Sequence, residues 1–294
     1  MARKWKFRVD IFTQNSPIGD EPKPTKTKTD EMDTDTLILT NLFKDTMNVT
    51  VKPHHHMKKE ELLEEIKGIT EKKEEFEVYF FVFLTYLYNE DKTTDGVRIQ
   101  CYDDPISLEE IFDLVKDKPP FIGKQKIFLV QADDQTILRG ATKTVVYEGE
   151  ETPLPIQIHK IPTDCDRLVM FSTLPQQLYQ DLHTATTSQI TSGVGNINIT
   201  DAGKAVKSPS DNSQNPNAKA SLLVAAFDEV IRAALADQAL KTEDLLIQTT
   251  RINRIIDFKI KQLKTLKIFK DTKFQIPLVT SSLRNQVYML DFDK

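Results

Sequence analysis

The feature that most constrains the fold is an almost continuous apolar run, FEVYFFVFLT, at residues 76–85. β-Branched and aromatic residues follow one another there, without the polar alternation of a strand that has one face in water. Such a run is typical of a strand covered on both faces, as in a parallel sheet between two layers of helices. Shorter runs, KIFLVQ at 126–131 and RLVMFS at 167–172, predict two more strands of this kind.

Helical patterns separate these strands along the chain. The helix that begins near residue 107 opens with a capping box, Ser107-Leu108-Glu109-Glu110. The alternation predicts an α/β fold, a mostly parallel sheet of about six strands with helices on both faces. The active site of such a sheet lies beyond the carboxyl ends of its strands, so we expect a site just after residues 85, 131 and 172. The expected helices are 33–46, 57–69, 107–116, 220–237 and 243–260, and the other expected strands are 5–12, 48–52, 276–283 and 286–291.

The composition narrows the classes of function. Charged residues make up 28% of the chain and the formal net charge is −5, so we expect no nucleic-acid partner, which would require a concentrated basic surface. No stretch approaches the roughly 18 consecutive apolar residues of a membrane span, and no apolar signal core follows the basic start of the chain. We therefore expect no membrane partner. Because Cys101 and Cys165 are the only cysteines, we expect no disulfide framework and a cytoplasmic location.

Short motifs occur in a particular order along the chain. Residues 131–135 read QADDQ after one buried strand, and residues 83–87 read FLTYL at the end of another. The caspase family has Gln-Ala-Cys-X-Gly with a histidine about 50 residues upstream. Tyr86 stands 47 positions before Asp133. Five further segments resemble caspase motifs in the family's order, and together they make the resemblance specific: GKQKIF at 123–128, HKIP at 159–162 with DRL at 166–168, FSTLP at 171–175, TRINR at 250–254 and QIP at 275–277.

The resemblance implies a caspase-like fold in which the two catalytic positions are changed. Caspases need a cysteine thiolate as nucleophile and a histidine to move protons. Asp133 stands at the cysteine position and Tyr86 at the histidine position. We therefore expect no catalytic residues, no cofactor and no metal, although Leu87 could still offer a backbone N–H to an oxyanion hole.

The family's pocket for an aspartate side chain uses two arginines and a glutamine. Gln131 matches the glutamine, Asp181 aligns with one arginine, and Thr29 falls near the other. A pocket that has exchanged arginine for aspartate repels an acidic side chain. Asp133, Asp134 and Asp181 leave open a second interpretation, an acidic pocket for a basic side chain.

The resemblance also implies an organisation of the chain. Residues 1–134 correspond to a large-subunit-like part and residues 164–294 to a small-subunit-like part. Within the latter, residues at about 187–219 are rich in Ser, Asn, Gly and Thr and almost free of large apolar groups, and this composition predicts a disordered loop. Because residues 135–163 contain no aspartate, we expect this intersubunit linker to stay uncleaved. We expect no helical prodomain, so that recruitment would occur through the caspase-like domain itself.

A regulatory role is the leading hypothesis. Caspases dimerise through an edge strand near the carboxyl end, which here carries Ile276, Leu278, Val279, Thr280, Ser281, Ser282 and Leu283. An exposed edge is a template for strand pairing. The expected partner is an active caspase in a heterodimer, with activation favoured over decoy inhibition, and a homodimer is a further possibility. Two other hypotheses are a hydrolase with a substituted site and a passive peptide-binding decoy.

The remaining histidines and cysteines have structural interpretations. His54, His55 and His56 are consecutive, so they are poorly placed to face one metal ion, and a solvated loop is the simpler interpretation. His159 belongs to the HKIP motif. Cys101 and Cys165 are distant in sequence from the catalytic position, and a buried or incidental thiol is preferred to a relocated Cys–His dyad.

Overall fold

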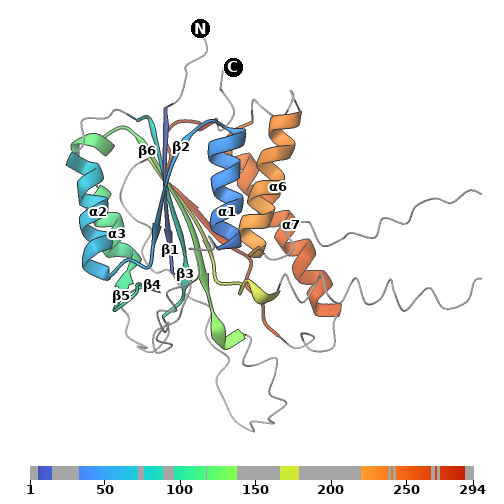
Figure 1. Cartoon of the computed structure of the whole chain (residues 1–294). Coiled ribbons are helices and arrows are strands. Elements are labelled where there is room, and N and C mark those ends of the chain that lie inside the picture. The colour runs from blue at the N-terminus through green and yellow to red at the C-terminus, as the bar shows by residue number, and fades with distance from the viewer. Residues whose placement is uncertain are drawn as a thin grey trace, which may run out of the picture.

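The chain forms one layered α/β structure, seen in a computed structural model (Figure 1). The structure describes residues 6–14, 33–71, 76–88, 96–116, 118–137, 166–178, 220–237, 240, 243–265, 269 and 272–288. Its elements are β1 (Phe7–Thr13), α1 (Thr34–Thr40), η1 (Asn41–Thr46), β2 (Thr50–His55), α2 (Lys59–Glu71), β3 (Val78–Tyr86), β4 (Arg98–Gln100), β5 (Pro105–Ser107), α3 (Leu108–Val115), η2 (Pro119–Phe121), β6 (Gln125–Asp133), β7 (Arg167–Ser172), α6 (Leu222–Ala236), α7 (Leu245–Thr265) and β8 (Leu278–Ser281).

The central sheet has six strands in the order β2-β1-β3-β6-β7-β8. Every neighbouring pair is parallel except β7 and β8, which are antiparallel. The predicted α/β fold with a mostly parallel sheet is therefore confirmed. The part of the chain before residue 138 supplies four adjacent strands, and the part after residue 165 supplies β7 and β8. The two parts meet where β6 pairs with β7.

The alternation of side chains along β3 explains why both faces of the sheet are covered. Phe80 and Val82 point into one core, which α1, α6 and α7 close. Phe81 and Phe83 point into a second core, which α2 and α3 close on the other face. Because successive side chains of a strand point to opposite faces, the apolar run buries residues in both cores at once (Figure 1).

Two helix starts follow from serine caps. Ser107 Oγ accepts a hydrogen bond from the backbone N–H of Glu109 at 3.2 Å at the start of α3. Ser221 Oγ accepts one from Val224 N at 3.3 Å at the start of α6. Each serine satisfies a backbone donor that the first turn of a helix leaves without a partner.

Several boundaries differ from the sequence prediction. The expected helix 33–46 is an α-helix only to Thr40 and continues as a π-helical turn, η1. The second helix near the carboxyl end reaches Thr265, beyond the expected residue 260, and the strand expected at 276–283 is the shorter β8. The antiparallel pair β4–β5 was not predicted, because strands of three residues carry too little periodicity to recognise.

The strand expected at 286–291 is wrong for residues 286–288, which are irregular in the structure. Val287 is buried, and its carbonyl accepts a hydrogen bond from Leu245 N at 2.8 Å. Its own N–H donates to Asp244 Oδ1 at 3.0 Å. The backbone of Val287 therefore serves the first turn of α7 instead of a strand ladder, and residues 289–291 lie outside the described residues.

Several other predictions also fall outside the described residues: Thr29, Asp181, the loop at 187–219 and nearly all of the linker at 135–163. Among the helices that the structure describes, none combines the length and apolar character that crossing a membrane requires.

Candidate functional site

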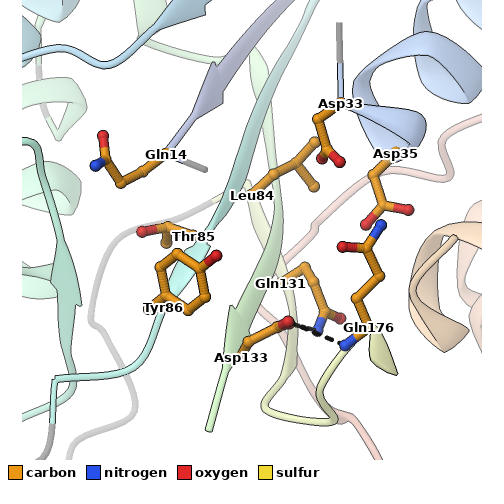
Figure 2. A pocket seen from close by; sticks show the side chains of 9 residues that line it. All are labelled: Gln14, Asp33, Asp35, Leu84, Thr85, Tyr86, Gln131, Asp133 and Gln176. Atoms are coloured by element: carbon orange, nitrogen blue, oxygen red, sulfur yellow. Dashed lines mark hydrogen bonds between the residues drawn. The ribbon is translucent and has the colours of Figure 1, made fainter. Parts of the chain in front are cut away.

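A pocket of about 70 Å³ opens at the carboxyl ends of the parallel strands. It lies where the sequence predicted a site, since β3, β6 and the segment after β7 all contribute to its walls. Figure 2 shows the nine residues that line it: Gln14, Asp33, Asp35, Leu84, Thr85, Tyr86, Gln131, Asp133 and Gln176.

Strand register brings the two predicted catalytic positions together. In the β3–β6 ladder, Tyr86 is directly opposite Asp133, and Leu84 is opposite Gln131. Leu84 packs in the core on the α1 side of the sheet. Tyr86, Gln131 and Asp133 share its face because side chains alternate along strands. Two positions 47 residues apart in sequence are therefore neighbours in one pocket.

Asp133 is held by two hydrogen bonds. Gln131 Nε2 donates to its Oδ1 at 2.6 Å, and the backbone N–H of Gln176 donates to its Oδ2 at 2.9 Å (Figure 2). Burial raises the pKa of Asp133 to about 6, and the charge of Asp33 acts in the same direction, while the two hydrogen bonds oppose it. The carboxyl group thus sits in a site that favours its neutral form more than water does.

Leu87 does not offer a free donor to an oxyanion. Its backbone N–H donates to the carbonyl oxygen of Asp133 at 3.1 Å, so the expectation that this amide serves an oxyanion hole is wrong for this structure. The side chain of Tyr86 is partly buried beside it.

Asp33 and Asp35 at the start of α1 were not predicted as site residues. Burial raises the pKa of Asp33, although a hydrogen bond from the Gln176 side chain opposes this. Burial and then the charge of Asp33 raise the pKa of Asp35 well above its ordinary value. Asp35 also accepts a hydrogen bond from Ser221 N at 2.8 Å, which joins α1 to the start of α6.

Of three other predicted site residues, the structure describes Asp134 alone. Asp134 follows Asp133 but does not line the pocket, because its Oδ1 accepts hydrogen bonds from the backbone N–H and the hydroxyl of Thr136 at 2.9 and 2.6 Å. Thr29 and Asp181 lie outside the described residues, so the pocket as described contains Gln131 alone of the predicted substrate-binding set.

His54 and Cys101 both line a second, smaller cavity of about 20 Å³, on the opposite face of the sheet. His54 is buried, unlike the expected solvated loop, and it stacks on Phe12 with ring centroids 4.6 Å apart. Its Nε2 is 3.2 Å from Asp10 Oδ1. Burial raises the pKa of the Cys101 thiol to about 12, and this pair therefore lacks the thiolate that a nucleophilic dyad needs.

Asp10, His54 and Glu65 place ligand atoms within 4.8 Å of one another, the one such group found among the described residues. Cations of the chain already pair with both carboxylates. Arg8 Nε lies 2.7 Å from Asp10 Oδ2, and Lys52 Nζ bonds Glu65 Oε1 at 2.5 Å. These pairs leave little negative charge for a metal ion, so the cluster is better described as an ion-pair network beneath α2.

The edge strand expected to form an interface is β8. It has one hydrogen-bonded neighbour, β7, among the described strands. Val279 and Leu283 pack against the core on the α1 side, whereas Ser281 is exposed and Ile276, before the strand, is 43% exposed. The sheet therefore ends in a short strand with an open side.

Comparisons with known proteins agree with the fold. The model of the family described as caspase domain matches residues 23–288. A solved structure of pro-sf-caspase-1 resembles this chain with a TM-score of 0.60 and 17% sequence identity, covering 97% of this chain and 94% of that one. At this identity the likeness shows the fold alone. The comparison with curated proteins gives no significant match. Because the family match spans five of the six strands of the sheet and eight of the nine residues that line the pocket, the chain belongs to the caspase family of cysteine peptidases.

Proposed function

We propose that the chain is a non-catalytic caspase homologue that regulates an active caspase in the cytoplasm by pairing with it through the open edge of β8. Activation of the partner is the favoured direction, because the sheet and its edge are complete while the chemistry is replaced. The observation that carries the proposal is the pairing of Tyr86 with Asp133 at the ends of β3 and β6.

The chemistry of the pocket supports the non-catalytic part. Amide hydrolysis by a caspase needs a thiolate and an imidazole, and neither a cysteine nor a histidine is among the residues that line the described pocket. Loss of one member of such a catalytic unit costs on the order of a millionfold in turnover. The carboxyl of Asp133 is a weak nucleophile and is held by Gln131 and Gln176.

The geometry of β8 supports the partner part. Ser282 N donates to Arg167 O at 2.7 Å, and Ser282 O accepts from Asp166 N at 3.0 Å, so the backbone groups of Ser282 face β7. Backbone groups alternate in direction along an antiparallel strand. Those of Val279 and Ser281 therefore face the open side, where a strand of a second molecule can accept and donate hydrogen bonds.

The test is a titration of the pure chain into an active caspase from the same organism, with peptide cleavage as the readout. A saturable rise is expected. A saturable fall would replace activation by inhibition, and no effect on any caspase of that organism would refute a regulatory role. The pure chain alone is expected to cleave no peptide, and turnover that survives removal of contaminants would instead support a substituted mechanism.

Two variants of β8 locate the interface. Ser281→Pro removes an N–H that faces the open side, which an edge strand tolerates, and so it should weaken pairing while the fold persists. Ser281→Ala is its matched control, since it keeps the N–H. Thr280→Asp buries an unpaired charge in the interface and should weaken the effect about 100-fold or more, whereas Thr280→Val should not. If both Ser281→Pro and Thr280→Asp regulate with unchanged affinity, the interface lies elsewhere.

A further inference from the structure

The pocket at the ends of β3 and β6 has an unusual chemical lining. Of its nine residues, three carry carboxyl groups and three carry amides: Asp33, Asp35, Asp133, Gln14, Gln131 and Gln176. None of the nine is lysine, arginine or histidine. The three aspartates come from α1 and from the end of β6, and they approach the same space from two sides (Figure 2). The described pocket therefore gathers three carboxyl groups with no cationic side chain among its lining residues.

A second observation, independent of the carboxylates, also indicates a missing hydrogen-bond donor. Gln131 is 2% exposed, and its Oε1 is buried without a hydrogen-bond partner. The orientation of this amide is determined, because its Nε2 donates at 2.6 Å both to Asp133 Oδ1 and to Leu174 O. Turning the amide over would place its oxygen against these two acceptors. Gln131 thus presents an unsatisfied acceptor in the pocket that Asp33 and Asp133 line (Figure 2).

We propose that this pocket binds the guanidinium group of an arginine side chain from a peptide or protein segment, held by Asp33, Asp133 and Gln131. The proposal goes beyond regulation through β8 and does not require it. The proposed ligand is positively charged, whereas the family resemblance implies a negatively charged aspartate side chain in this part of the fold.

The shape of the acceptor set favours a guanidinium. Its five N–H donors spread in a plane and match several acceptors at once, and it keeps its charge when it is desolvated. A pocket of about 70 Å³ accommodates a side-chain head group. Among the described residues only Asp10, His54 and Glu65 place three ligand atoms within 4.8 Å of one another, so the three pocket aspartates do not form such a group.

The burial of the pocket aspartates also favours a cationic ligand. Burial raises the pKa of both Asp33 and Asp133, which means that the empty site makes their charged forms unfavourable. His55, outside the lining, already lowers the pKa of Asp33, and a cation bound inside the pocket would add opposite charge next to both carboxylates and favour their ionised forms. Asp35 lies deeper and is already held by Ser221 N, and it contributes to the field without being required to touch the ligand.

The test uses four blocked tetrapeptides that differ only in the last side chain: arginine, citrulline, lysine or aspartate. Binding to the whole chain is measured by calorimetry near neutral pH. The arginine peptide should bind saturably and about tenfold or more tightly than the citrulline peptide, which has nearly the same shape without the charge. Lysine should be intermediate and aspartate should not bind. Equal binding of arginine and citrulline peptides, or no saturation with arginine up to about 10 mM, would overturn the proposal.

Variants then assign the site. Asp33→Asn and Asp133→Asn should each weaken binding of the arginine peptide about fivefold or more, because each removes one charged acceptor. Asp134→Asn is the matched control, since Asp134 adjoins Asp133 in sequence but bonds Thr136 outside the pocket, and its affinity should stay within about twofold of the parent. Loss of binding in Asp134→Asn with retention in the other two would also refute the site.

The outcome is separable from that of the regulatory proposal. Ser281→Pro should bind the arginine peptide like the parent chain, because β8 is not part of the pocket. The peptide comparison on the parent chain needs no variant, so it decides the matter even if an aspartate variant fails to fold.

Discussion

Replacing Asp133 by asparagine should leave the stability of the chain nearly unchanged at low pH and raise it at neutral pH. In the folded chain the pKa of Asp133 is raised to about 6 from an ordinary 3.8, chiefly by burial. The folded state therefore holds this proton more tightly than the unfolded state. The resulting stabilisation is fully present below pH 3.8 and is lost as the pH rises through about 6.

The magnitude follows from the size of the shift. A difference of about two pKa units corresponds to about 3 kcal/mol, since each unit is worth about 1.4 kcal/mol. Asp133→Asn cannot ionise and escapes this loss. Its amide has the same pattern as the protonated carboxyl, one acceptor for Gln131 Nε2 or Gln176 N and one donor, so the substitution costs little while Asp133 is protonated. The variant should thus match the stability of the parent to within about 1 kcal/mol near pH 3.5 and be about 3 kcal/mol more stable near pH 7.5.

Urea unfolding followed by circular dichroism at several pH values measures both free energies. Thr85→Val is the control, because it removes the hydrogen bond from Thr85 Oγ1 to Gln100 O at the same end of the sheet and titrates nothing. Its effect should be independent of pH. If the free-energy difference between Asp133→Asn and the parent is also the same at every pH, then Asp133 titrates as it does in water, and the argument from burial fails.

Three further predictions concern other parts of the chain. In a Cys165→Ser background, Cys101 should resist thiol reagents near pH 8 until the chain is unfolded, because burial raises its pKa to about 12, and rapid labelling of the native chain would contradict this. Asp166→Asn should cost about 1 kcal/mol at neutral pH, a modest value because Arg284 is largely exposed. The hydrogen bonds and charge of Arg284 lower the pKa of Asp166, so this cost should shrink as the pH falls through that lowered pKa, and a constant cost in urea titrations would speak against the pairing. Phe81→Ala should cost about 3–5 kcal/mol in urea unfolding, since Phe81 is fully buried against Phe128, and a cost below about 1 kcal/mol would show that the core refills the space.

The fold could be predicted because its strongest signals are local. The runs at 76–85, 126–131 and 167–172 are β3, β6 and β7 in the structure, and the capping box at Ser107 predicts the start of α3, which lies between β3 and β6 in the chain. The segment at 286–291 shows the limit of this reasoning. Its apolar residues were expected to pair in a sheet, but Val287 is buried at the first turn of α7, and no local pattern distinguishes the two kinds of burial.

The site could be predicted only in part. Tyr86 and Asp133 could be identified because they stand in segments that resemble caspase motifs at the ends of predicted strands, but their direct pairing depends on register. A run that is apolar on both faces carries no polar marker of register. Asp33 and Asp35 were missed because acidic residues before a helix are usually interpreted as favourable charges at its first turn. Their position over the ends of β3 and β6 is a property of the tertiary fold.

The junction of β6 with β7 has a consequence for how the molecule could be divided. Every sheet neighbour of β1, β2 and β3 comes from the chain before residue 138, and the sheet contact of that part with the remainder is β6–β7. Residue Asp35 of the first part also bonds Ser221 of the second. A single backbone break between residues 137 and 166 would therefore leave two fragments that still fit each other. The chain would no longer raise their effective concentration, and the β6–β7 ladder and the contact between α1 and α6 would hold them together. Such a break turns one polypeptide into a complex of two fragments that can dissociate on dilution, whereas a continuous chain holds both parts together at any concentration.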